Sequence, residues 1–246
     1  MERRPFVLSG GGARGAAHIG VLKAFSEAGI IPSVIAATSA GAIVGALICD
    51  GYEADDILEV IATHKIFDSF SWRSPLRGTF SLEPLRKMLQ TKLTAAHFEE
   101  LKTPLFITAT NYISGEQQVF STGPLIPAIL AACSIPMVFA AVVIDEVPYV
   151  DGGISNNLPV EPLVGKYADI IGVHVNPLPR LDPKAGFSQR LDRTLHLTIR
   201  PSTMRSKVFC SQFIEPAGLE KFGMFDAKKT KQIAAAGYDH VKKLFY

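Results

Sequence analysis

Apolar runs and helical stripes alternate along the first fifty residues. Pro5–Leu8 and Ser33–Thr38 are short apolar runs beside turn residues, which is typical of buried strands. Ala16–Ala28 carries apolar residues at helical spacing and ends at Gly29, while Ala40–Cys49 is small and apolar all round. Strands that alternate with helices predict an α/β fold with a parallel sheet covered on both faces.

The pattern changes after this first unit. Residues 53–101 are polar, with helical patterns at Asp55–His64 and Leu82–Leu93 around an aromatic loop, Phe67–Trp72. We expect this region to be a helical, lid-like insertion over one end of the sheet. The remaining pattern predicts strands at Leu105–Tyr112, Gln117–Ser121, Ala141–Ile144, Pro148–Val150 and Ile170–Val175, and helices at Leu125–Cys133 and Ala227–Phe245. No repeat or linker interrupts the chain, so residues 1–246 are expected to form a single domain.

One stretch has the length of a membrane span. Gln117–Ile144 has no charged residue, and its last twenty residues are mostly apolar. Three prolines, at positions 124, 127 and 136, lie in or beside those residues; proline costs about 3 kcal/mol in a soluble helix, although membrane helices tolerate it better. We expect a strand, a buried helix, a proline-containing loop and a second strand, each too short to cross a bilayer.

Composition excludes several classes of protein. With 246 residues, 48% of them hydrophobic, the chain is not a disordered segment, and a net charge of +2 argues against a nucleic-acid partner. The first apolar run is too short for a signal peptide. Three scattered cysteines, Cys49, Cys133 and Cys210, are expected to be buried free thiols of a cytoplasmic protein, with no metal site and no cofactor.

The glycine run Gly10-Gly11-Gly12-Ala13-Arg14-Gly15 stands between a predicted strand and a predicted helix. Glycines there let backbone N–H groups approach an anion, and the following helix N-terminus adds a positive dipole end. Such a loop serves either as a phosphate cradle or as an oxyanion hole. Its G-x-G-x-x-G pattern also matches dinucleotide-binding folds, but the second strand ends at Ala36-Ala37-Thr38-Ser39 without the acidic residue that binds ribose, which argues against a nucleotide.

Ser39 occupies a strand-to-helix turn between small neighbours. Its surroundings fit a nucleophile elbow of the type G-x-S-x-G, with Ala37 in the first position, Ala40 after the serine and Gly41 in the last position. The alternative is a simple N-cap for the helix that begins at Ala40, and the two roles can coincide. A serine nucleophile needs a base.

Candidates for that base are histidines and one carboxylate. His18, inside the first helix, and His174, near a strand end, are expected to be buried hydrogen-bonding residues. Asp151 ends a short apolar strand and is followed by Gly152 and Gly153, which leave room for a partner. The alternative for Asp151 is an ordinary Asp-Gly turn.

Together, these segments closely resemble the patatin-like phospholipase family. The resemblance rests on Leu8–Leu22, Thr38–Gly41, Asp151–Gly153 with Asn156-Asn157-Leu158-Pro159, and Ser134–Phe139. It covers nearly the whole chain and is weakest at residues 60–100 and 176–210. It implies a three-layer α/β/α fold and a Ser-Asp dyad without histidine, and the departure is Ala37 in place of glycine.

The resemblance also implies roles for named residues. Ser39 would attack the ester carbonyl and Asp151 would accept its proton, while N–H groups at Gly10, Gly11 and Gly12 would stabilise the oxyanion with Arg14 beside them. Supporting positions of the three motifs are Gly15, Ala37, Ala40, Gly41, Gly152 and Gly153.

Lipid or other acyl esters are the substrates that this family implies, so contact with a membrane surface is one hypothesis. The aromatic loop Phe67–Trp72 and the basic stretch Arg180–Lys207 are its candidates, since residues 180–246 hold 13 Lys and Arg against 6 Asp and Glu. The alternative is an ordinary surface helix docked on the sheet. A second hypothesis from another class is a lipid-binding or regulatory protein on the same fold with little catalysis.

Overall fold

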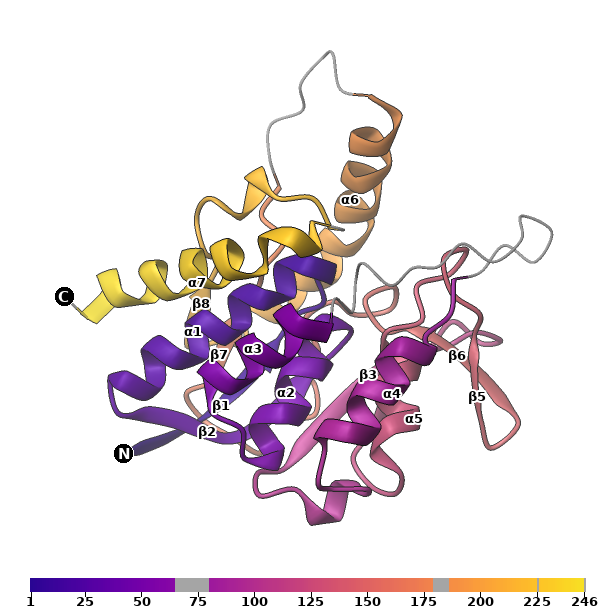
Figure 1. Ribbon diagram of the computed structural model, residues 1–246, viewed down its shortest axis with the longest axis horizontal. Helices are drawn as coiled ribbons and strands as arrows, with labels where there is room; N and C mark the ends of the chain where they lie inside the picture. Colours follow the sequence, from indigo (N-terminus) through magenta and orange to yellow (C-terminus); the bar gives the residue numbers. More distant parts are fainter. Residues whose placement is uncertain (65–79, 179–185, 225, 246) are drawn as a thin grey trace.

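The computed structural model describes residues 1–64, 80–178, 186–224 and 226–245 (Figure 1). Its centre is an eight-stranded sheet whose hydrogen-bonded path runs β5-β6-β3-β2-β1-β7-β8, with β4 paired to β3 off this path. The strands are β1 (Glu2–Leu8), β2 (Ile30–Ala37), β3 (Leu105–Asn111), β4 (Gln117–Phe120), β5 (Val142–Ile144), β6 (Val147–Asp151), β7 (Ile171–Val173) and β8 (Gln212–Ile214). The five strands from β3 to β8 along the path are parallel, and β4, β5 and β6 add an antiparallel end.

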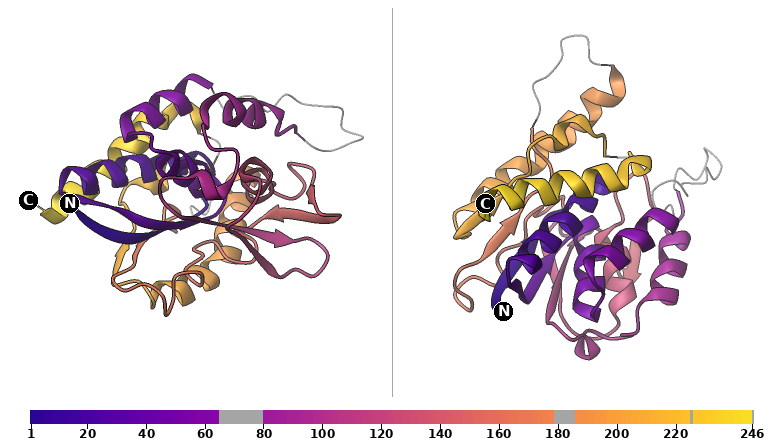
Figure 2. Two further views of the ribbon diagram at one scale, coloured as in Figure 1. Left: turned by 90° about the horizontal axis from the view of Figure 1, so that it is seen from below. Right: turned by 60° about the vertical axis from the view of Figure 1, so that its left-hand side comes forward.

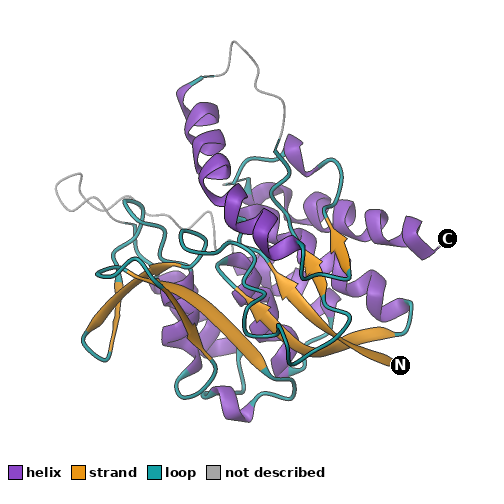
Figure 3. Ribbon diagram, turned by 180° about the vertical axis from the view of Figure 1, so that it is seen from behind, coloured by secondary structure: helices purple, strands orange, loops and turns teal. Residues whose placement is uncertain are grey.

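Helices cover both faces of the sheet. They are α1 (Ala16–Glu27), α2 (Ala40–Asp50), α3 (Ala54–His64), α4 (Glu83–Lys92), α5 (Leu125–Ala132), α6 (Phe187–Lys207) and α7 (Thr230–Phe245), with short 3-10 turns η1 (Gly12–Gly15), η2 (Phe98–Glu100), η3 (Leu219–Lys221) and η4 (Ala227–Lys229). Figure 2 shows α1, α3, α4 and α7 above the sheet and α6 below it. Figure 3, seen from behind, shows α6 and long loops in front of the sheet. Leu158, Val160 and Leu163, from the coil between β6 and β7, pack in the smaller core with side chains of β1 and β2. The fold is therefore the expected three-layer α/β/α sandwich.

The last residues of β1, Phe6 to Leu8, show why the buried part of this strand is apolar without alternation. Phe6 and Leu8 are fully buried in the large core beneath the helices, whereas Val7 is fully buried in a smaller core with Leu158 and Leu163. A strand that is covered on both faces keeps apolar residues at every position.

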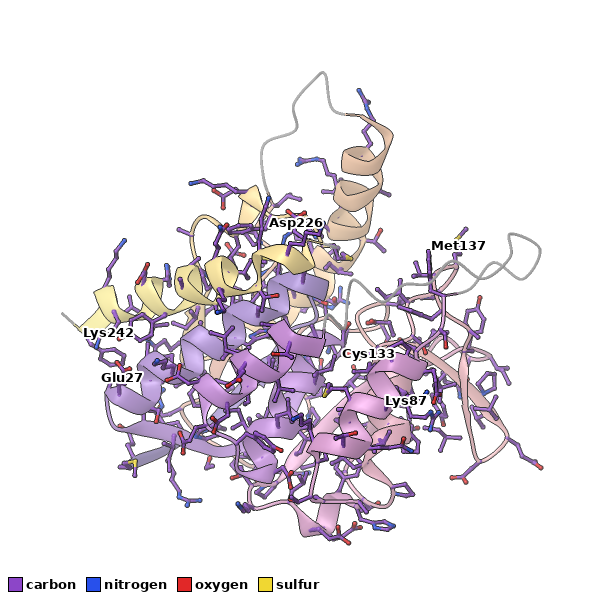
Figure 4. All side chains as sticks on the ribbon, viewed as in Figure 1. Glu27, Lys87, Cys133, Met137, Asp226 and Lys242 are labelled. Carbon is purple, nitrogen blue, oxygen red and sulfur yellow. The ribbon has the colours of Figure 1, made fainter. Side chains whose placement is uncertain are left out.

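Helices α1 and α7 touch backbone to backbone. A Cβ added to Gly20 would lie 1.9 Å from the carbonyl oxygen of Ala234, and one added to Gly237 would lie 2.3 Å from that of Ala17. At their far end, Lys242 Nζ donates a hydrogen bond to Glu27 at 3.2 Å (Figure 4). Glycines on facing helices thus set how close these two elements come.

Most predicted elements are confirmed, with ends shifted by a few residues. The uncharged stretch divides as expected into β4, α5, a loop and β5, and none of the helices within the described ranges is long and apolar enough to cross a membrane. Strand β8 (Gln212–Ile214) was not predicted from the sequence. The aromatic loop Phe67–Trp72 lies outside the described residues. Helices α3 and α4, within the predicted insertion, pack on the large core through Ile57, Leu85 and Leu89.

Candidate active site

The ends of β2 and β6 meet on one edge of β3. β2 pairs with Leu105–Ile107 and β6 with Ala109–Asn111, while β4 pairs with Ile107–Thr110 and so overlaps both pairings. A strand has two edges, so β2 and β6 must share the edge opposite β4. β2 is parallel to β3 and β6 is antiparallel to it, so the C-terminal ends of β2 and β6 point toward each other. This arrangement brings the residues that follow β2 to Asp151.

Ser39 follows β2 with a strained backbone. Its φ of 51° and ψ of −129° lie where an L-residue is rarely found. Ser39 is the N-cap residue of α2, yet its side chain makes no capping hydrogen bond. Its hydroxyl instead donates to Asp151 Oδ2 at 2.6 Å. The position is thus a cap, while the side chain is directed to the carboxylate.

The sharp turn at Ser39 depends on small residues around it. A Cβ on Gly41 would lie 2.6 Å from the carbonyl oxygen of Leu8, so the turn has no room for a larger residue there. Ala40 fills the space beside Gly15, where an added Cβ would come within 2.4 Å of its methyl group. Ala37 is fully buried, and a Cβ built on Gly45 of α2 would lie 3.7 Å from its methyl carbon. The methyl group that departs from the G-x-S-x-G pattern therefore faces a glycine on the neighbouring helix.

Both carboxylate oxygens of Asp151 accept hydrogen bonds. Oδ2 accepts from Ser39, and Oδ1 accepts from the backbone N–H of Gly153 at 2.8 Å. Asp151 is only 6% exposed, and this burial raises its pKa from 3.8 to about 6, although both hydrogen bonds act in the opposite direction. At neutral pH the group is mostly ionised, and its pKa is close enough to 7 for it to take up and return a proton.

The backbone of Asp151 is fixed by its neighbours. Its N–H donates to the carbonyl of Ser134 at 2.8 Å, and its own carbonyl accepts from Thr110 Oγ1 at 2.9 Å. Gly152 follows at a point where an added Cβ would lie 2.1 Å from the carbonyl oxygen of Thr108. The carboxylate therefore stands at a strand end that neighbouring groups hold in place. Asp151 also begins a turn, because the Ile154 N–H donates to its carbonyl at 3.3 Å, so the expected Asp-Gly turn and the contact with Ser39 occur together.

The glycine run forms a loop between β1 and α1. Gly10 N donates to the carbonyl of Asn157 at 3.2 Å, and Ala13 N donates to that of Met224 at 2.8 Å. Gly12 has a φ of 55°, which favours glycine. Within the part of the chain that the structure describes, the N–H groups of Gly11 and Gly12 have no hydrogen-bond acceptor. Of the three expected donors, Gly10 is thus already engaged, and Gly11 and Gly12 can still bind an anion.

The Arg14 side chain is buried, at 1% exposure. Its Nε donates to the carbonyl of Phe222 at 2.7 Å, and its Nη1 donates to His196 Nε2 at 2.6 Å. These contacts tie the glycine loop to η3 and α6. His196 lies 182 positions from Arg14 and was not recognised in the sequence.

The histidines expected to be structural are buried and hydrogen-bonded. His18 Nε2 contacts the carbonyl of Ser9 at 2.8 Å, and burial lowers its pKa to about 4. His174 Nδ1 lies 2.9 Å from Glu215 Oε1. Among the described residues, neither Ser39 nor Asp151 has a hydrogen bond to a histidine, and no group of three His, Cys, Asp or Glu side chains could hold a metal ion.

A mostly parallel sheet between layers of helices, with a strained serine at one strand end and a buried carboxylate hydrogen-bonded to it, defines the class as α/β proteins with a candidate Ser-Asp pair. Comparison with known proteins narrows that class. A model of the patatin-like phospholipase family matches residues 6–164. The chain belongs to this family, as the sequence motifs indicated.

Several curated relatives are named as NTE family proteins. An uncharacterized NTE family protein of Mycobacterium tuberculosis is 34% identical over 181 residues, which are 71% of this chain and 49% of that protein. The neuropathy target esterase of Drosophila melanogaster is 29% identical over 163 residues, 63% of this chain and 11% of that protein. The chain thus spans about half the length, or less, of these curated relatives.

A solved structure shares the fold. VipD from Legionella pneumophila superposes with a TM-score of 0.57 at 15% identity, covering 99% of this chain and 67% of that chain. This likeness supports the fold alone.

Proposed function

We propose that the protein is a serine-dependent lipid acyl hydrolase, of phospholipase A, lysophospholipase or carboxylesterase type. The observation that carries the proposal is the 2.6 Å hydrogen bond from Ser39 Oγ to Asp151 Oδ2, made by a serine whose strained backbone keeps its side chain from capping α2. Family membership supports a lipid ester as the substrate class and lipid catabolism as the setting.

In the first half of the reaction, Ser39 Oγ would attack the acyl carbonyl carbon while its proton passes to Asp151 Oδ2. The tetrahedral intermediate then collapses, the alcohol takes the proton from Asp151 as it leaves, and the acyl group stays on Ser39. In the second half, water gives a proton to Asp151 and attacks the acyl carbon of the acyl-enzyme. As this second intermediate collapses, the bond from the acyl carbon to Ser39 Oγ breaks, Asp151 returns the proton to Oγ, and the fatty acid is released.

The oxyanion of each intermediate would be held by the glycine loop. Gly11 and Gly12 are the donors that we assign, since their N–H groups have no acceptor among the described residues, whereas Gly10 N already donates to Asn157. Each preorganised donor is worth on the order of 10²–10³ in rate. Arg14 would act by holding the loop through Phe222 and His196.

Hydrolysis of a p-nitrophenyl ester tests the dyad. Ser39→Ala and Asp151→Asn should each abolish hydrolysis, with far-UV circular dichroism unchanged. Matched controls are Ser26→Ala on the exposed end of α1 and Asp145→Asn in the exposed β5–β6 turn, both of which should keep wild-type rates. Full activity in either dyad variant would exclude the proposed mechanism.

The alternative, a lipid-binding protein on the same fold without catalysis, predicts a different result with an organophosphonate. An activated nucleophile at Ser39 should be labelled covalently in the wild type and left unlabelled in Ser39→Ala, as read by mass spectrometry of the intact chain. Binding of fatty acid without labelling would favour the alternative. A panel of lipids, scored by released fatty acid in wild type and Ser39→Ala, then identifies the substrate.

Contact with an anionic membrane surface is part of the same proposal. Helix α6 exposes Arg190, Arg200, Arg205 and Lys207, while Ser202, Thr203 and Ser206 on its other side are buried. Binding to anionic vesicles should weaken as salt rises, because exposed charges are screened. If binding does not change with salt concentration, or if no binding occurs at 50 mM salt, then α6 is an ordinary surface helix and not a membrane-binding one.

A further inference from the structure

Helix α6 lies outside the residues that the family model matches, yet it contacts both loops of the candidate site. Residues 6–164 contain the glycine loop, Ser39 and Asp151, and α6 begins at Phe187. Its middle turn contacts Arg14, and its last two turns contact Asn156 and Asn157, which follow Asp151.

The first contact joins α6 to the glycine loop. His196 is 2% exposed, and its Nε2 accepts a hydrogen bond from Arg14 Nη1 at 2.6 Å. Nε2 can accept only when it carries no proton, so the ring places its proton on Nδ1. A buried guanidinium is costly unless its donors are satisfied, so Arg14 stays where His196 and the carbonyl of Phe222 hold it.

Arg14 transmits this constraint to the candidate oxyanion donors. It is two residues beyond Gly12, and its backbone N–H donates to the carbonyl of Gly11 at 3.1 Å. Gly11 and Gly12 therefore sit on a turn whose far end is fixed by the Arg14 side chain. A shift of Arg14 would therefore move the turn that carries the Gly11 and Gly12 N–H groups.

The second contact joins α6 to the loop after Asp151. Asn157 N points to Ser202 Oγ at 3.5 Å, and Ser206 Oγ donates to Asn156 Oδ1 at 3.4 Å. Both bonds are long, and all of these side chains are buried. Asn157 also accepts, through its carbonyl, the hydrogen bond from Gly10 N. The same asparagine thus contacts α6 on one side and the glycine loop on the other.

We propose that α6 sets the position of the glycine loop relative to the loop that follows Asp151 (residues 152–158). His196 is the principal positioning residue and Ser202 is the second. His196 acts through Arg14, and Ser202 acts through the backbone of Asn157. The inference rests on the proposed function only in that these two loops are the ones assigned to the oxyanion and the base.

Hydrogen exchange and kinetics test this proposal together. The variants are His196→Ala, Ser202→Ala and His196→Gln, whose amide oxygen can still accept from Arg14, with exposed Thr198→Ala on the same helix as the matched control. In His196→Ala, amide exchange in peptides covering residues 9–16 should quicken at least several-fold, and kcat on a soluble ester should fall about tenfold or more with KM changed less than about twofold. Ser202→Ala should quicken exchange in residues 152–158, and His196→Gln should recover most of the lost kcat.

A double-mutant cycle separates positioning from general destabilisation. If His196 acts through Arg14, then adding His196→Ala to Arg14→Met should lower kcat no further than Arg14→Met alone. If the two substitutions each lower kcat and their effects multiply, the proposal is overturned. It is also overturned if His196→Ala and Ser202→Ala both show the amide exchange and the kcat of Thr198→Ala. Should His196→Ala fail to fold, His196→Gln and Ser202→Ala carry the same comparison. If the wild type hydrolyses no ester, the proposed function fails, while exchange in residues 9–16 still decides whether α6 positions the loop.

Discussion

The contact between α1 and α7 and the contact between Ser39 and Asp151 are built in opposite ways. Gly20 and Gly237 let two helix backbones meet with no side chain between them, so close packing holds the middle of that contact, and the hydrogen bond from Lys242 to Glu27 lies at its far end. At the candidate site, strained backbone and buried polar groups are held by single hydrogen bonds. Shape complementarity supplies stability, whereas the polar arrangement stores strain that stability elsewhere must offset. Substitutions in the two regions should therefore separate stability from activity.

The largest expected effect is at Ser39, where a substitution should lower activity and raise stability. Ser39→Gly removes the hydroxyl that we propose as the nucleophile, so ester hydrolysis should fall on the order of 10³-fold or more. Glycine accepts a φ of 51° without strain, so the variant should unfold at a higher temperature than Ser39→Ala, by an amount reflecting about 1–3 kcal/mol. Thermal unfolding followed by circular dichroism measures the difference. Equal or lower stability of Ser39→Gly would show that the turn stores no strain.

The converse result is expected at the helix contact. Gly237→Ala places a methyl group where 2.3 Å separates an added Cβ from the Ala17 carbonyl oxygen, so the helices must move apart. Unfolding free energy should fall by about 1–3 kcal/mol, with kcat retained at temperatures where the protein stays folded. Gly186→Ala, where an added Cβ meets no atom of the described residues within 4 Å, is the control. An unchanged melting temperature in Gly237→Ala would contradict the packing argument.

The pH dependence of activity tests the buried carboxylate. Protonated Asp151 cannot accept the serine proton, so kcat/KM should be level above pH 7 and fall tenfold per pH unit well below about 6. The stability of the folded protein should instead gain from protonation of Asp151 as the pH falls. Because the folded-state pKa of about 6 lies above the ordinary 3.8, burying the charge costs stability at neutral pH, and this cost disappears as the pH falls through 6 toward 3.8.

Asp151→Asn, which is never ionised, should therefore be more stable than wild type at pH 8, and the difference should shrink at pH 4.5. Urea titrations at both pH values measure it. A wild type that stays fully active down to pH 4.5, with the same stability difference at both pH values, would mean that the pKa of Asp151 is not raised.

The smallest effect is expected where the family pattern is broken. Ala37→Gly restores the G-x-S-x-G motif, but the methyl group of Ala37 already fits beside Gly45. Activity should stay within about twofold of wild type, and stability should fall by about 0.5–1 kcal/mol from the glycine in a strand. A large rise in kcat would show that the alanine does distort the elbow.

Local patterns were enough to predict the parts of the site that form within one strand–turn–helix unit. The glycine loop follows β1 and Ser39 follows β2, so glycines and small residues at fixed spacing reveal both. The pairing of β2 and β6 on one edge of β3 depends on register between distant segments, which no local pattern contains. The contact between Arg14 and His196 spans 182 positions for the same reason.

The alternatives that the sequence left open also depend on contacts between distant segments. Whether Ser39 only caps α2 depends on where its hydroxyl points, and this follows from the position of Asp151, which is 112 residues away. The engaged N–H of Gly10 depends on Asn157, a residue recognised within a motif but without a role. Donors and acceptors that meet only in three dimensions cannot be paired from their order along the chain.

The meeting of two strand ends on one edge has a consequence for how the chain can vary in length. The separation of Ser39 and Asp151 is set where β2 and β6 pair with β3, and the hairpin tips at Ser114-Gly115 and Asp145-Glu146 lie at the outer ends of those strands. Insertions at either tip would lengthen the 112-residue interval without altering the pairing. Ser39 and Asp151 are thus insulated from the loops between them, and a new segment can be grafted at either tip while the two side chains keep their spacing.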